Sequence, residues 1–485
     1  MRCAVLIPEW HVEEIFLSAF ARSMGSYQEP SGTLYVAAML EKAGHEVLFA
    51  DGALLTNEEI VARIAPGRPR WVGMYVCAVL WPSAQRLLTA LRAALPDAVL
   101  AIGGPWAATM PRESLEACPA LDQVFTGEGE EASVEALAAL EAGIEPRQVR
   151  GLVFRDRDGT LVDTGWRDMI EDLDALPFPA RHLLGEDIQR CALPPGGYRA
   201  RPVAHLIASR GCTNRCIYCF HMERKRGIRY RSAASIVDEV ETCVFQFGFR
   251  EVRFLDDNFT GDRERVFEIC DLLEARRLTI PWYVSSRVDT VDFEMLTRMK
   301  RAGCWAILYG IETGVQKNLN AIGKHVTLEQ IRSAVAMTRK AGIEMFLPFM
   351  FGIPGETYEE GLQTIDFAIE LDPYYANFNT LTPFPGTWLW DHGDRLGRMS
   401  RDPARMNFQA AAFVPNTMTE AQIVDLRRIA FRRFYSRPRF MVRWLRGATN
   451  RHVIGALIRG IPSFATLWLR PDAFWNAPEQ PAGDP

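Results

Sequence analysis

The sequence predicts an α/β protein in which two blocks of alternating strands and helices precede a helical C-terminal region. Short apolar runs that end in turn residues alternate with amphipathic segments over residues 1–150, and this alternation resumes near residue 203. A stretch rich in proline and glycine separates the blocks and favours a linker. The 485 residues are enough for several domains with separate cores. We expect domains at 1–150, 201–390 and 391–485, with a β-hairpin and linker at 151–200.

The first block predicts a doubly wound, Rossmann-like sheet. Its apolar runs are short and continuous, as expected for parallel strands buried on both faces. Ligands of such sheets bind at the carboxyl ends of the strands. The expected strands are Cys3–Pro8, Glu46–Asp51, Trp71–Val76, Val99–Gly104 and Gln123–Gly127. The expected helices include Leu34–Ala43, Glu58–Ala65, Ser83–Leu95 and Glu130–Ala142.

The second block predicts a partial (β/α)6 barrel, whose chemistry would lie on the strand-to-helix loops at one rim. Before it, residues 151–165 predict a β-hairpin that turns at Asp158–Gly159. The expected barrel strands are Val203–Ala208, Glu251–Leu255, Trp282–Ser285, Trp305–Tyr309, Met345–Phe351 and Ala376–Leu381. The expected helices include Ala234–Phe247, Arg263–Ala275 and Leu328–Ala341.

The composition narrows the class of protein. A hydrophobic content of 48% with 24% charged residues is ordinary for a globular chain, and a net charge of −5 gives no indication of a nucleic-acid partner. Ten cysteines are too sparse for a disulfide scaffold. The first apolar run is too short for a signal peptide, and no run is long enough for a membrane span. We expect a cytoplasmic protein.

Three cysteines, Cys212, Cys216 and Cys219, directly follow the first strand of the second block. Three thiolates can each bind one iron of a 4Fe–4S cube, which leaves the fourth iron open. Gly211, Thr213 and Asn214 favour a loop that can wrap around such a cluster. One alternative is a zinc site completed by His221, but zinc sites usually pair two halves and no second half is present. A second alternative is three unrelated core cysteines.

The CxxxCxxC triplet, with the aromatic Tyr218 before its last cysteine, resembles the signature of radical S-adenosylmethionine (AdoMet) enzymes. The resemblance implies that the open iron chelates AdoMet and that electron transfer releases a 5′-deoxyadenosyl radical. It also implies a small-molecule substrate and an external electron donor of the flavodoxin or ferredoxin type. Such chemistry belongs to the cofactors, while the protein supplies orientation.

Further turns in the second block resemble the AdoMet-contact segments of that family. Leu255–Phe259 stands where the family has a Gly-Gly-Glu-like segment. It is similar to the Asp-Asp-Asn-Phe form that the cobalamin-linked subgroup has there. The turns near Glu312 and Gly352 also resemble turns of the family. The alternative for each turn is plain loop geometry. His221, Glu223 and Arg224 follow the cluster loop and could face the cavity, but we expect ordinary rim residues. The implied AdoMet contacts are Tyr218, Asp256, Asp257, Asn258, Ser285, Arg287, Glu312, Gly352, Ile353 and Gly355.

The first block resembles the cobalamin-binding domain of one large radical AdoMet subgroup, through Pro30–Tyr35, Gly44–Val47, Val72–Met74 and Ile102–Pro105. It lacks the Asp-x-His-x-x-Gly motif of other cobalamin domains, so no histidine of that loop would ligate cobalt. The alternatives are a degenerate domain that only packs on the barrel, and a methylthiotransferase-like second cluster on Cys3, Cys77 and Cys118. The implied cobalamin contacts are Tyr75, Val76, Cys77, Gly103 and Gly104.

The C-terminal region is rich in arginine. Between Leu426 and Pro471 there are eleven arginines, no lysine and no acidic residue, interleaved with aromatic side chains. One interpretation is a helical lid over an acidic substrate or cofactor. A second is peripheral contact with an anionic membrane, which would make the protein membrane-associated. A third is a helical cap with a solvated basic face.

Two activities fit every motif. The first is a cobalamin-dependent radical methylase that transfers a methyl group to an unactivated carbon of a small-molecule or specialised-metabolite substrate. The second is an oxidative cyclase on a tetrapyrrole-like substrate, because the chain also resembles the anaerobic magnesium-protoporphyrin IX monomethyl ester cyclase type through its Asp-Asp-Asn-Phe segment and Tyr435–Pro438. A cofactor carrier without turnover is the non-enzymatic alternative. We expect the methylase.

Overall fold

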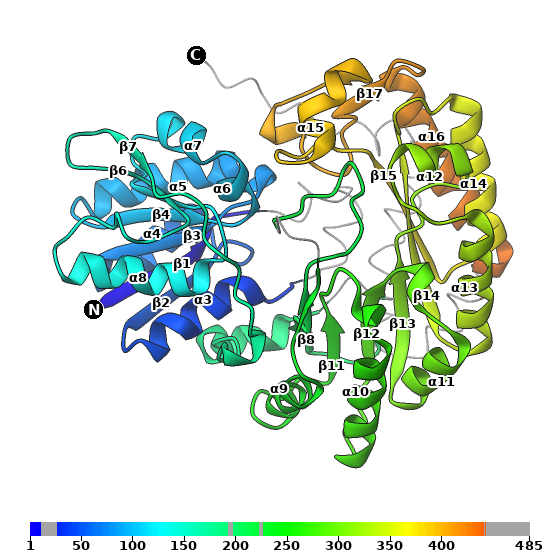
Figure 1. Ribbon diagram of the computed structural model, residues 1–485, viewed down its shortest axis with the longest axis horizontal. Coiled ribbons are helices and arrows are strands. Elements are labelled where there is room, and N and C mark those ends of the chain that lie inside the picture. The colour runs from blue at the N-terminus through cyan, green and yellow to red at the C-terminus, as the bar shows by residue number, and fades with distance from the viewer. Residues whose placement is uncertain (11–26, 193–196, 223–226, 441, 443–485) are drawn as a thin grey trace.

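The computed structural model describes residues 1–10, 27–192, 197–222, 227–440 and 442. The N-terminal domain and an open barrel lie side by side (Figure 1), and the segment between them packs against both. Both predicted α/β blocks are therefore confirmed.

The N-terminal domain is built on a seven-stranded sheet of order β2-β1-β3-β4-β5-β6-β7. The first five strands are parallel, whereas β6 and β7 form an antiparallel hairpin on β5. The hairpin expected in the linker thus extends the first sheet. The strands are β1 (Arg2–Ile7), β2 (Glu46–Asp51), β3 (Trp71–Tyr75), β4 (Val99–Gly103), β5 (Gln123–Phe125), β6 (Leu152–Arg155) and β7 (Leu161–Asp163).

Helices cover both faces of this sheet because its strands are apolar on both sides. Cys3 and Val5 pack under α3 and α8, whereas Ala4 and Leu6 pack under α4 and α5. This alternation of faces is the period-two pattern of a strand. The helices are α3 (Ser31–Lys42), α4 (Asn57–Ile64), α5 (Trp81–Ala94), α6 (Pro105–Thr109), α7 (Pro111–Ala117) and α8 (Gly129–Glu141).

The segment that connects the two domains packs against both of them and is not a loose linker. Its 3-10 segment η4 (Arg181–Arg190) buries Leu184 and Ile188 in the barrel core. Arg181 is fully buried and pairs with Glu29 of the N-terminal domain and with Glu239 of the barrel. Pro194, Pro195 and Gly196 of the predicted linker lie outside the described residues.

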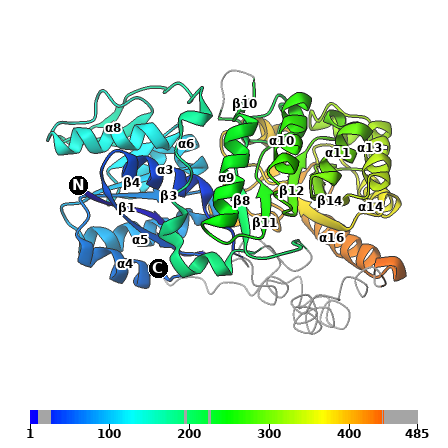
Figure 2. The ribbon, with the colours of Figure 1, turned by 90° about the horizontal axis from the view of Figure 1, so that it is seen from below.

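The barrel is an open, parallel six-stranded sheet of order β15-β14-β13-β12-β11-β8. Its helices line the outer face (Figure 2), where they bury the main hydrophobic core. The strands are β8 (Val203–Leu206), β11 (Glu251–Phe254), β12 (Trp282–Ser286), β13 (Cys304–Tyr309), β14 (Glu344–Phe351) and β15 (Tyr375–Thr380). The helices are α9 (Ala233–Phe245), α10 (Arg263–Ala275), α11 (Phe293–Arg301), α12 (Gln316–Ala321), α13 (Leu328–Lys340) and α14 (Tyr358–Leu371).

The C-terminal region differs in two ways from the expectation of a helical, basic segment. Besides α15 (Trp388–His392) and α16 (Glu420–Tyr435), it contains an antiparallel pair, β16 (Gly397–Met399) and β17 (Phe413–Pro415). In addition, three arginines in α16 and directly after it contact the rest of the fold, whereas Arg432 and Arg439 are exposed. Arg427 is buried and donates to the carbonyls of Phe378 and Gln409, while Arg433 and Arg437 pair with Asp366 and Asp372 of the barrel.

The predicted lid or membrane contact beyond residue 442 lies outside the described residues. Among the helices that are described, none combines the length and the apolar character needed to cross a bilayer.

Candidate active site

The cysteine loop leaves the barrel after β8 and is held at both ends by a short antiparallel ribbon, β9 (Ser209–Arg210) with β10 (Arg229–Tyr230). Gly211 has a φ of 97°, which a side chain would strain, and this lets the chain turn directly into Cys212. Cys216 is buried, whereas Cys212 and Cys219 are partly exposed. The three predicted cluster ligands therefore share one loop at the carboxyl rim of the barrel.

Asn214 fastens the loop to the segment that follows α12. Its Nδ2 atom lies 3.3 Å from the carbonyl oxygen of Gly323, 3.1 Å from that of Lys324 and 3.2 Å from Cys216 Sγ. The Ile217 amide also donates to the carbonyl of Ile322 at 3.1 Å. These contacts fix the loop before any cofactor is added.

The electrostatic setting suits a cluster of negative charge. The hydrogen bond with Cys219 and the Lys324 ammonium lower the pKa of Cys216 to about 6, although burial opposes this shift. Burial raises the pKa of Cys212, which the charge of Arg287 opposes, and the hydrogen bond with Cys216 together with burial raises the pKa of Cys219. Thiolates are the forms that bind metal. Two cations therefore lie where the charge of the cluster would need compensation.

The donor set fits a cubic cluster. Within the described part of the chain, no three His, Cys, Asp or Glu side chains meet closely enough to hold a single ion. A 4Fe–4S cube needs no such meeting point, because each thiolate binds its own iron. The fourth ligand required by the zinc alternative, His221, has its Nε2 atom buried without a partner among the described residues.

Glu312 and Lys324 form a buried ion pair beside the cluster loop, with Glu312 Oε1 at 2.9 Å from Lys324 Nζ. The Tyr218 hydroxyl donates to Glu312, and burial together with this carboxylate raises the pKa of Tyr218. Glu312 has a φ of 71°, which is uncommon for a residue with a side chain and marks a position held by its surroundings. A Cβ atom on Gly310 would stand 2.5 Å from Glu312 Oε1, so glycine is required there.

Within the Asp256–Asn258 segment, Asp256 supports the cluster loop, whereas Asp257 is exposed. Asp256 is buried and accepts hydrogen bonds from Ser209 Oγ and the Ala208 amide, so it braces the base of the loop; burial raises the pKa of Asp256 to about 6. Asp257 is exposed and acts electrostatically on Cys212. Asn258 Oδ1 accepts from the Arg287 amide at 3.1 Å. The structure thus brings Asp257, Asn258 and Arg287 together near Cys212.

The Gly352–Glu356 turn is closed by its own glutamate. Glu356 Oε2 accepts from the amides of Gly352, at 2.7 Å, and Ile353, at 3.1 Å. Gly352 has a φ of 88°, and Ile353 is fully buried in a cluster against which Tyr218 packs. Gly355 is exposed and its carbonyl accepts from Lys317. Ser285 lies elsewhere, on the inner face of the barrel.

The expected cobalamin contacts lie at the carboxyl ends of β3 and β4. Gly104 has a φ of 97°, and a Cβ atom there would stand 2.8 Å from the carbonyl oxygen of Val76 and 2.9 Å from the Tyr75 ring. Val76 is buried, and its amide donates to the carbonyl of Gly103 at 2.8 Å. Tyr75 is 37% exposed, an apolar ring open to a ligand. The close packing of Val76 and Tyr75 therefore requires glycine at 104, and the exposed Tyr75 ring gives this edge of the sheet an apolar surface for a flat group.

Cys3 and Cys118 do not support a second cluster. Both are buried, and they belong to the cores on opposite faces of the N-terminal sheet. Cys77 packs with Cys118 on one face only. Of the predicted rim residues, Glu223 and Arg224 lie outside the described part.

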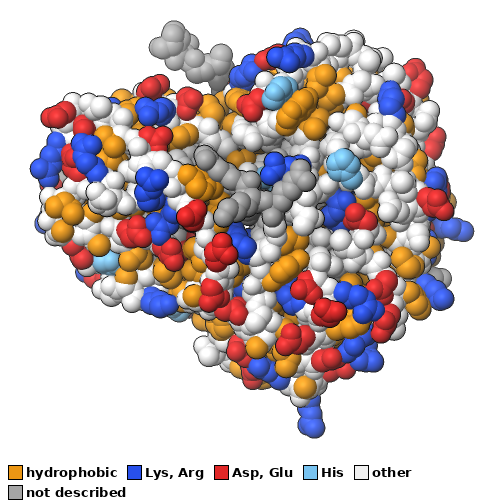
Figure 3. Space-filling view, viewed as in Figure 1, with side chains coloured by type: hydrophobic (Ala, Val, Ile, Leu, Met, Phe, Trp, Pro, Cys, Tyr) orange, Lys and Arg blue, Asp and Glu red, His pale blue; other side chains and the backbone are white. Residues whose placement is uncertain are grey.

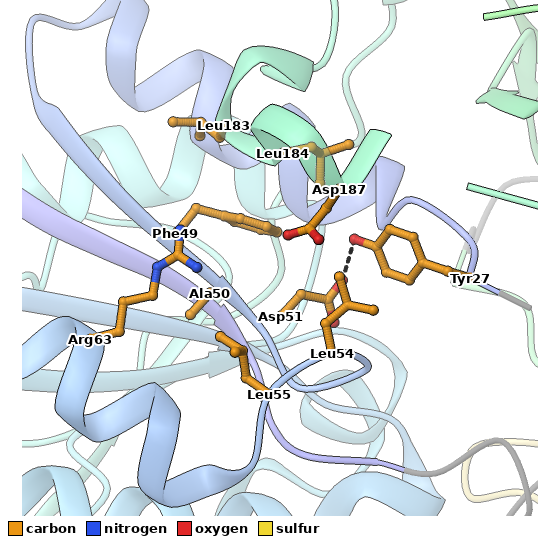
Figure 4. Close-up of a pocket in the computed structure, with 10 residues that line it drawn as sticks. All are labelled: Tyr27, Phe49, Ala50, Asp51, Leu54, Leu55, Arg63, Leu183, Leu184 and Asp187. Atoms are coloured by element: carbon orange, nitrogen blue, oxygen red, sulfur yellow. Dashed lines mark hydrogen bonds between the residues drawn. The ribbon is translucent and has the colours of Figure 1, made fainter. Parts of the chain in front are cut away.

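A small pocket opens at the carboxyl end of β2, away from the predicted contacts (Figure 4). The Tyr27 hydroxyl donates to Asp51 Oδ2 at 2.9 Å, and burial raises the pKa of Asp51 to about 6. Asp187 of η4 and Arg63 of α4 lie at its wall. No predicted site residue belongs to this pocket.

Salt bridges tie the cluster loop to the N-terminal domain. Arg210, just before the loop, contacts Glu128 and Glu130 at 2.6 Å each, and Arg229 of β10 contacts Glu128 at 2.8 Å. Sequence reasoning missed these residues, as it missed Lys324. The sequence did contain a signal for these salt bridges. The run Glu128-Gly129-Glu130 follows a predicted strand, and an arginine stands close to the first cysteine of the loop.

The two domains also meet at Gly386, in the loop before α15. A Cβ atom on Gly386 would stand 2.5 Å from Thr109 of α6 and 3.1 Å from the Phe220 ring. Phe220 directly follows Cys219. Helix α6, which follows the glycine pair, and the cluster loop therefore share one neighbour, on the side of the molecule where the N-terminal domain and the barrel are both in view (Figure 3).

This fold and site define an enzyme that combines a three-cysteine cluster barrel with a domain able to hold a corrin. The model of the radical SAM superfamily matches residues 206–368, and that of the B12 binding domain matches residues 17–137. An uncharacterized methyltransferase of Pyrococcus horikoshii is 31% identical over 88% of this chain and 92% of its own length. The chain belongs to the family of radical SAM enzymes with a B12-binding domain, and its cofactors are a 4Fe–4S cluster, AdoMet and cobalamin.

Two further comparisons describe the breadth of this family. The anaerobic magnesium-protoporphyrin IX monomethyl ester cyclase of Rubrivivax gelatinosus is 27% identical over 91% of this chain and 78% of its own length. The structure of the cobalamin-dependent AdoMet radical enzyme OxsB, with aqua-cobalamin and AdoMet bound, superposes with a TM-score of 0.74 at 16% identity, over 96% of this chain and 71% of that one. The predicted fold class is confirmed.

Proposed function

We propose that the protein transfers a methyl group from AdoMet to an unactivated carbon of a small-molecule substrate. The observation that carries this proposal is the junction at Gly386, where Thr109, close to the glycine pair, and Phe220, next to Cys219, meet. A methyl carrier and a radical source must reach the same carbon, so their sites must open onto one space. The methyltransferase relative supports the same activity.

When bound, the cluster would supply one-electron reduction of AdoMet, and cobalamin would supply a carrier for the methyl group. The residues of the chain position these groups. Cys212, Cys216 and Cys219 hold the cluster, Lys324 and Arg287 offset its charge, and Asp257, Asn258 and Glu312 lie at the rim where AdoMet would extend. Tyr75 and the Gly103–Gly104 turn would receive the corrin. The electron would come from a flavodoxin or ferredoxin type of donor.

The test is anaerobic turnover of the reconstituted protein with AdoMet whose methyl group is labelled. One turnover consumes two AdoMet molecules: one yields S-adenosylhomocysteine, and the other yields methionine and 5′-deoxyadenosine, which carries the hydrogen taken from the substrate. Label in the product, together with both nucleosides, is the expected result. Continued formation of 5′-deoxyadenosine and oxidised product without label would reject the methylase.

An oxidative cyclase is the second candidate, because the Rubrivivax cyclase is similar over nearly the whole chain. It would also release 5′-deoxyadenosine, but it would move no methyl group and would form no S-adenosylhomocysteine. The two activities therefore separate in the same experiment.

A further inference from the structure

The inner face of the barrel sheet keeps accessible side chains, although its outer face is fully packed. On β11, Arg253 is partly exposed while its neighbours Val252 and Phe254 are buried. The outward residues of successive strands, including Phe254, belong to the main core. We call the inner face the lumen face. Its partly exposed members are Arg253, Ser285, Leu308, Pro348, Asn377 and Asn379.

Arg253 brings a positive charge to the lumen face without a carboxylate partner among the described residues. Its guanidinium lies over the ring of Tyr283, 5.1 Å from the centroid, and its side chain hydrogen-bonds to Tyr283, while its Nε atom is buried with no hydrogen-bond partner in the part of the chain that the structure describes. Glu251 is on the same strand and face, but its carboxylate accepts from the amides of Arg199 and Ala200 and from Trp305 Nε1. Arg253 is therefore a partly exposed cation that can still pair with an anion entering from the lumen.

Two further sets of polar groups face the same space. His205 is the register partner of Arg253 on β8; it is fully buried, and both ring nitrogens lack partners within the described part of the chain. Burial and the charge of Arg253 lower the pKa of His205, so the ring is neutral and carries one N–H donor. At the other edge of the sheet, Asn377 and Asn379 of β15 present side-chain amides. Buried polar groups without partners call for an explanation such as a ligand.

We infer that the lumen face binds an anionic group of the substrate, a carboxylate or a phosphoryl group, on Arg253 with His205 beside it. This inference rests on the proposed function, because the anion would belong to the molecule that is methylated. A guanidinium fork matches the two oxygens of either anion. Asn377 and Asn379 would take polar groups elsewhere on the same molecule, so the substrate is small, polar and acidic.

The test measures anion binding to the cluster-reconstituted, cobalamin-loaded protein saturated with AdoMet. Labelled inorganic phosphate and labelled propionate are used in equilibrium dialysis, and the tighter of the two identifies the class of anion. We expect Arg253→Met to weaken binding at least about tenfold, and Arg253→Lys to restore part of it. The control is Arg276→Met, an exposed arginine paired with Asp238 and Glu241, which should bind as the wild type does.

A second measurement does not depend on how the variants fold. Phenylglyoxal should modify Arg253 in the wild-type protein, and the bound anion should protect it, as mass spectrometry of that peptide would show. Equal binding by Arg253→Met, or modification of Arg253 that the bound anion does not slow, would overturn the inference, since Arg253 would then serve no substrate anion. If the wild type also fails to cleave AdoMet, the proposed function fails; if it cleaves AdoMet but binds neither anion, only this inference fails.

Discussion

Arg210 and Glu128, which are 82 positions apart in the chain, form a salt bridge of 2.6 Å that joins the cluster loop to the N-terminal domain. Glu128 also holds Arg229, so one carboxylate fastens both strands of the β9–β10 ribbon. Burial opposes ionisation, but Arg229 and Arg210 together hold the pKa of Glu128 below its usual value. The distance between the two cofactor sites is thereby set by side chains rather than by a flexible hinge.

Glu128→Gln should therefore lower the free energy of unfolding by about 1–3 kcal/mol, because two mostly buried arginines lose a charged partner. Urea unfolding followed by circular dichroism measures this. The control is Arg332→Gln, whose pair with Glu370 is half-exposed and should cost no more than about 1 kcal/mol. Equal effects of the two variants would contradict the role of the salt bridge.

Replacing Cys212, Cys216 and Cys219 by alanine together should abolish the absorbance of the cluster and all AdoMet cleavage. Iron content and the yield of 5′-deoxyadenosine are the measurements. Cys270→Ala, a buried cysteine of α10, should keep its iron. Iron at the wild-type level in the triple variant would mean that these thiols are not the ligands.

Asn214→Ala should leave the fold intact but make the cluster labile, because it removes the contacts to the carbonyls of Gly323 and Lys324 and to Cys216. We expect iron to be lost several-fold faster to a chelator, at an unchanged unfolding midpoint. Thr213→Ala is the matched control, since Thr213 is exposed on the same loop. Loss of iron at the same rate from both variants would argue against the role of Asn214.

Gly104→Ala should weaken cobalamin binding at least tenfold while iron content stays constant, because the added Cβ atom would meet Val76 and Tyr75 at a φ that disfavours side chains. Spectroscopic titration with cobalamin measures the affinity. Gly143→Ala has a positive φ but open space around its Cβ position, so it controls for backbone strain alone. Unchanged affinity in Gly104→Ala would place the corrin elsewhere.

Glu356→Gln should stabilise the protein at high pH. Burial raises the pKa of Glu356 to about 8, with Glu360 adding to the shift and Lys317 opposing it. The folded state therefore favours the protonated acid, and its contribution to stability is lost as the pH rises from about 4.5 through 8. Glutamine keeps the acceptor for Gly352 and Ile353, and its NH2 group takes the place of Glu356 Oε1, which accepts from Asn318 Nδ2 at 3.5 Å. A flip of the Asn318 amide would turn its Oδ1, which has no partner among the described residues, toward that new donor.

Thermal unfolding of both proteins at pH 5 and pH 8.5 checks this prediction. The stability of the variant relative to the wild type should rise with pH by about 2 kcal/mol or more, since one pKa unit corresponds to 1.36 kcal/mol. A difference that is independent of pH would show that Glu356 titrates normally in the folded protein.

The strands could be predicted to within one or two residues because parallel strands buried on both faces give continuous apolar runs. The cluster ligands could be predicted because all three lie within eight positions of one loop. Both features are local in sequence. Short strands without such runs, as in β16 and β17, were not expected.

The supporting charges could not be predicted because they act across the fold. Lys324 pairs with Glu312 only after α12 brings the two together, and Arg210 meets Glu128 only when the domains dock. For the same reason, the arginines of α16 suggested a solvated or membrane-bound face. Arg427 is instead buried against β15, where it donates to the carbonyl of Phe378. Burial lowers the pKa of Arg427 to about 10.

The open edge of the barrel at β8 bears on whether the barrel can be produced without the N-terminal half. Among the described strands, β8 has a neighbour on one side only. On its other side, Glu29 accepts from the His205 amide, and Ser31 and Arg181 donate to the His205 carbonyl. A fragment beginning at residue 201 would expose a bare strand edge, a template for aggregation. A barrel produced alone would therefore need other groups to satisfy the His205 backbone at the edge of β8.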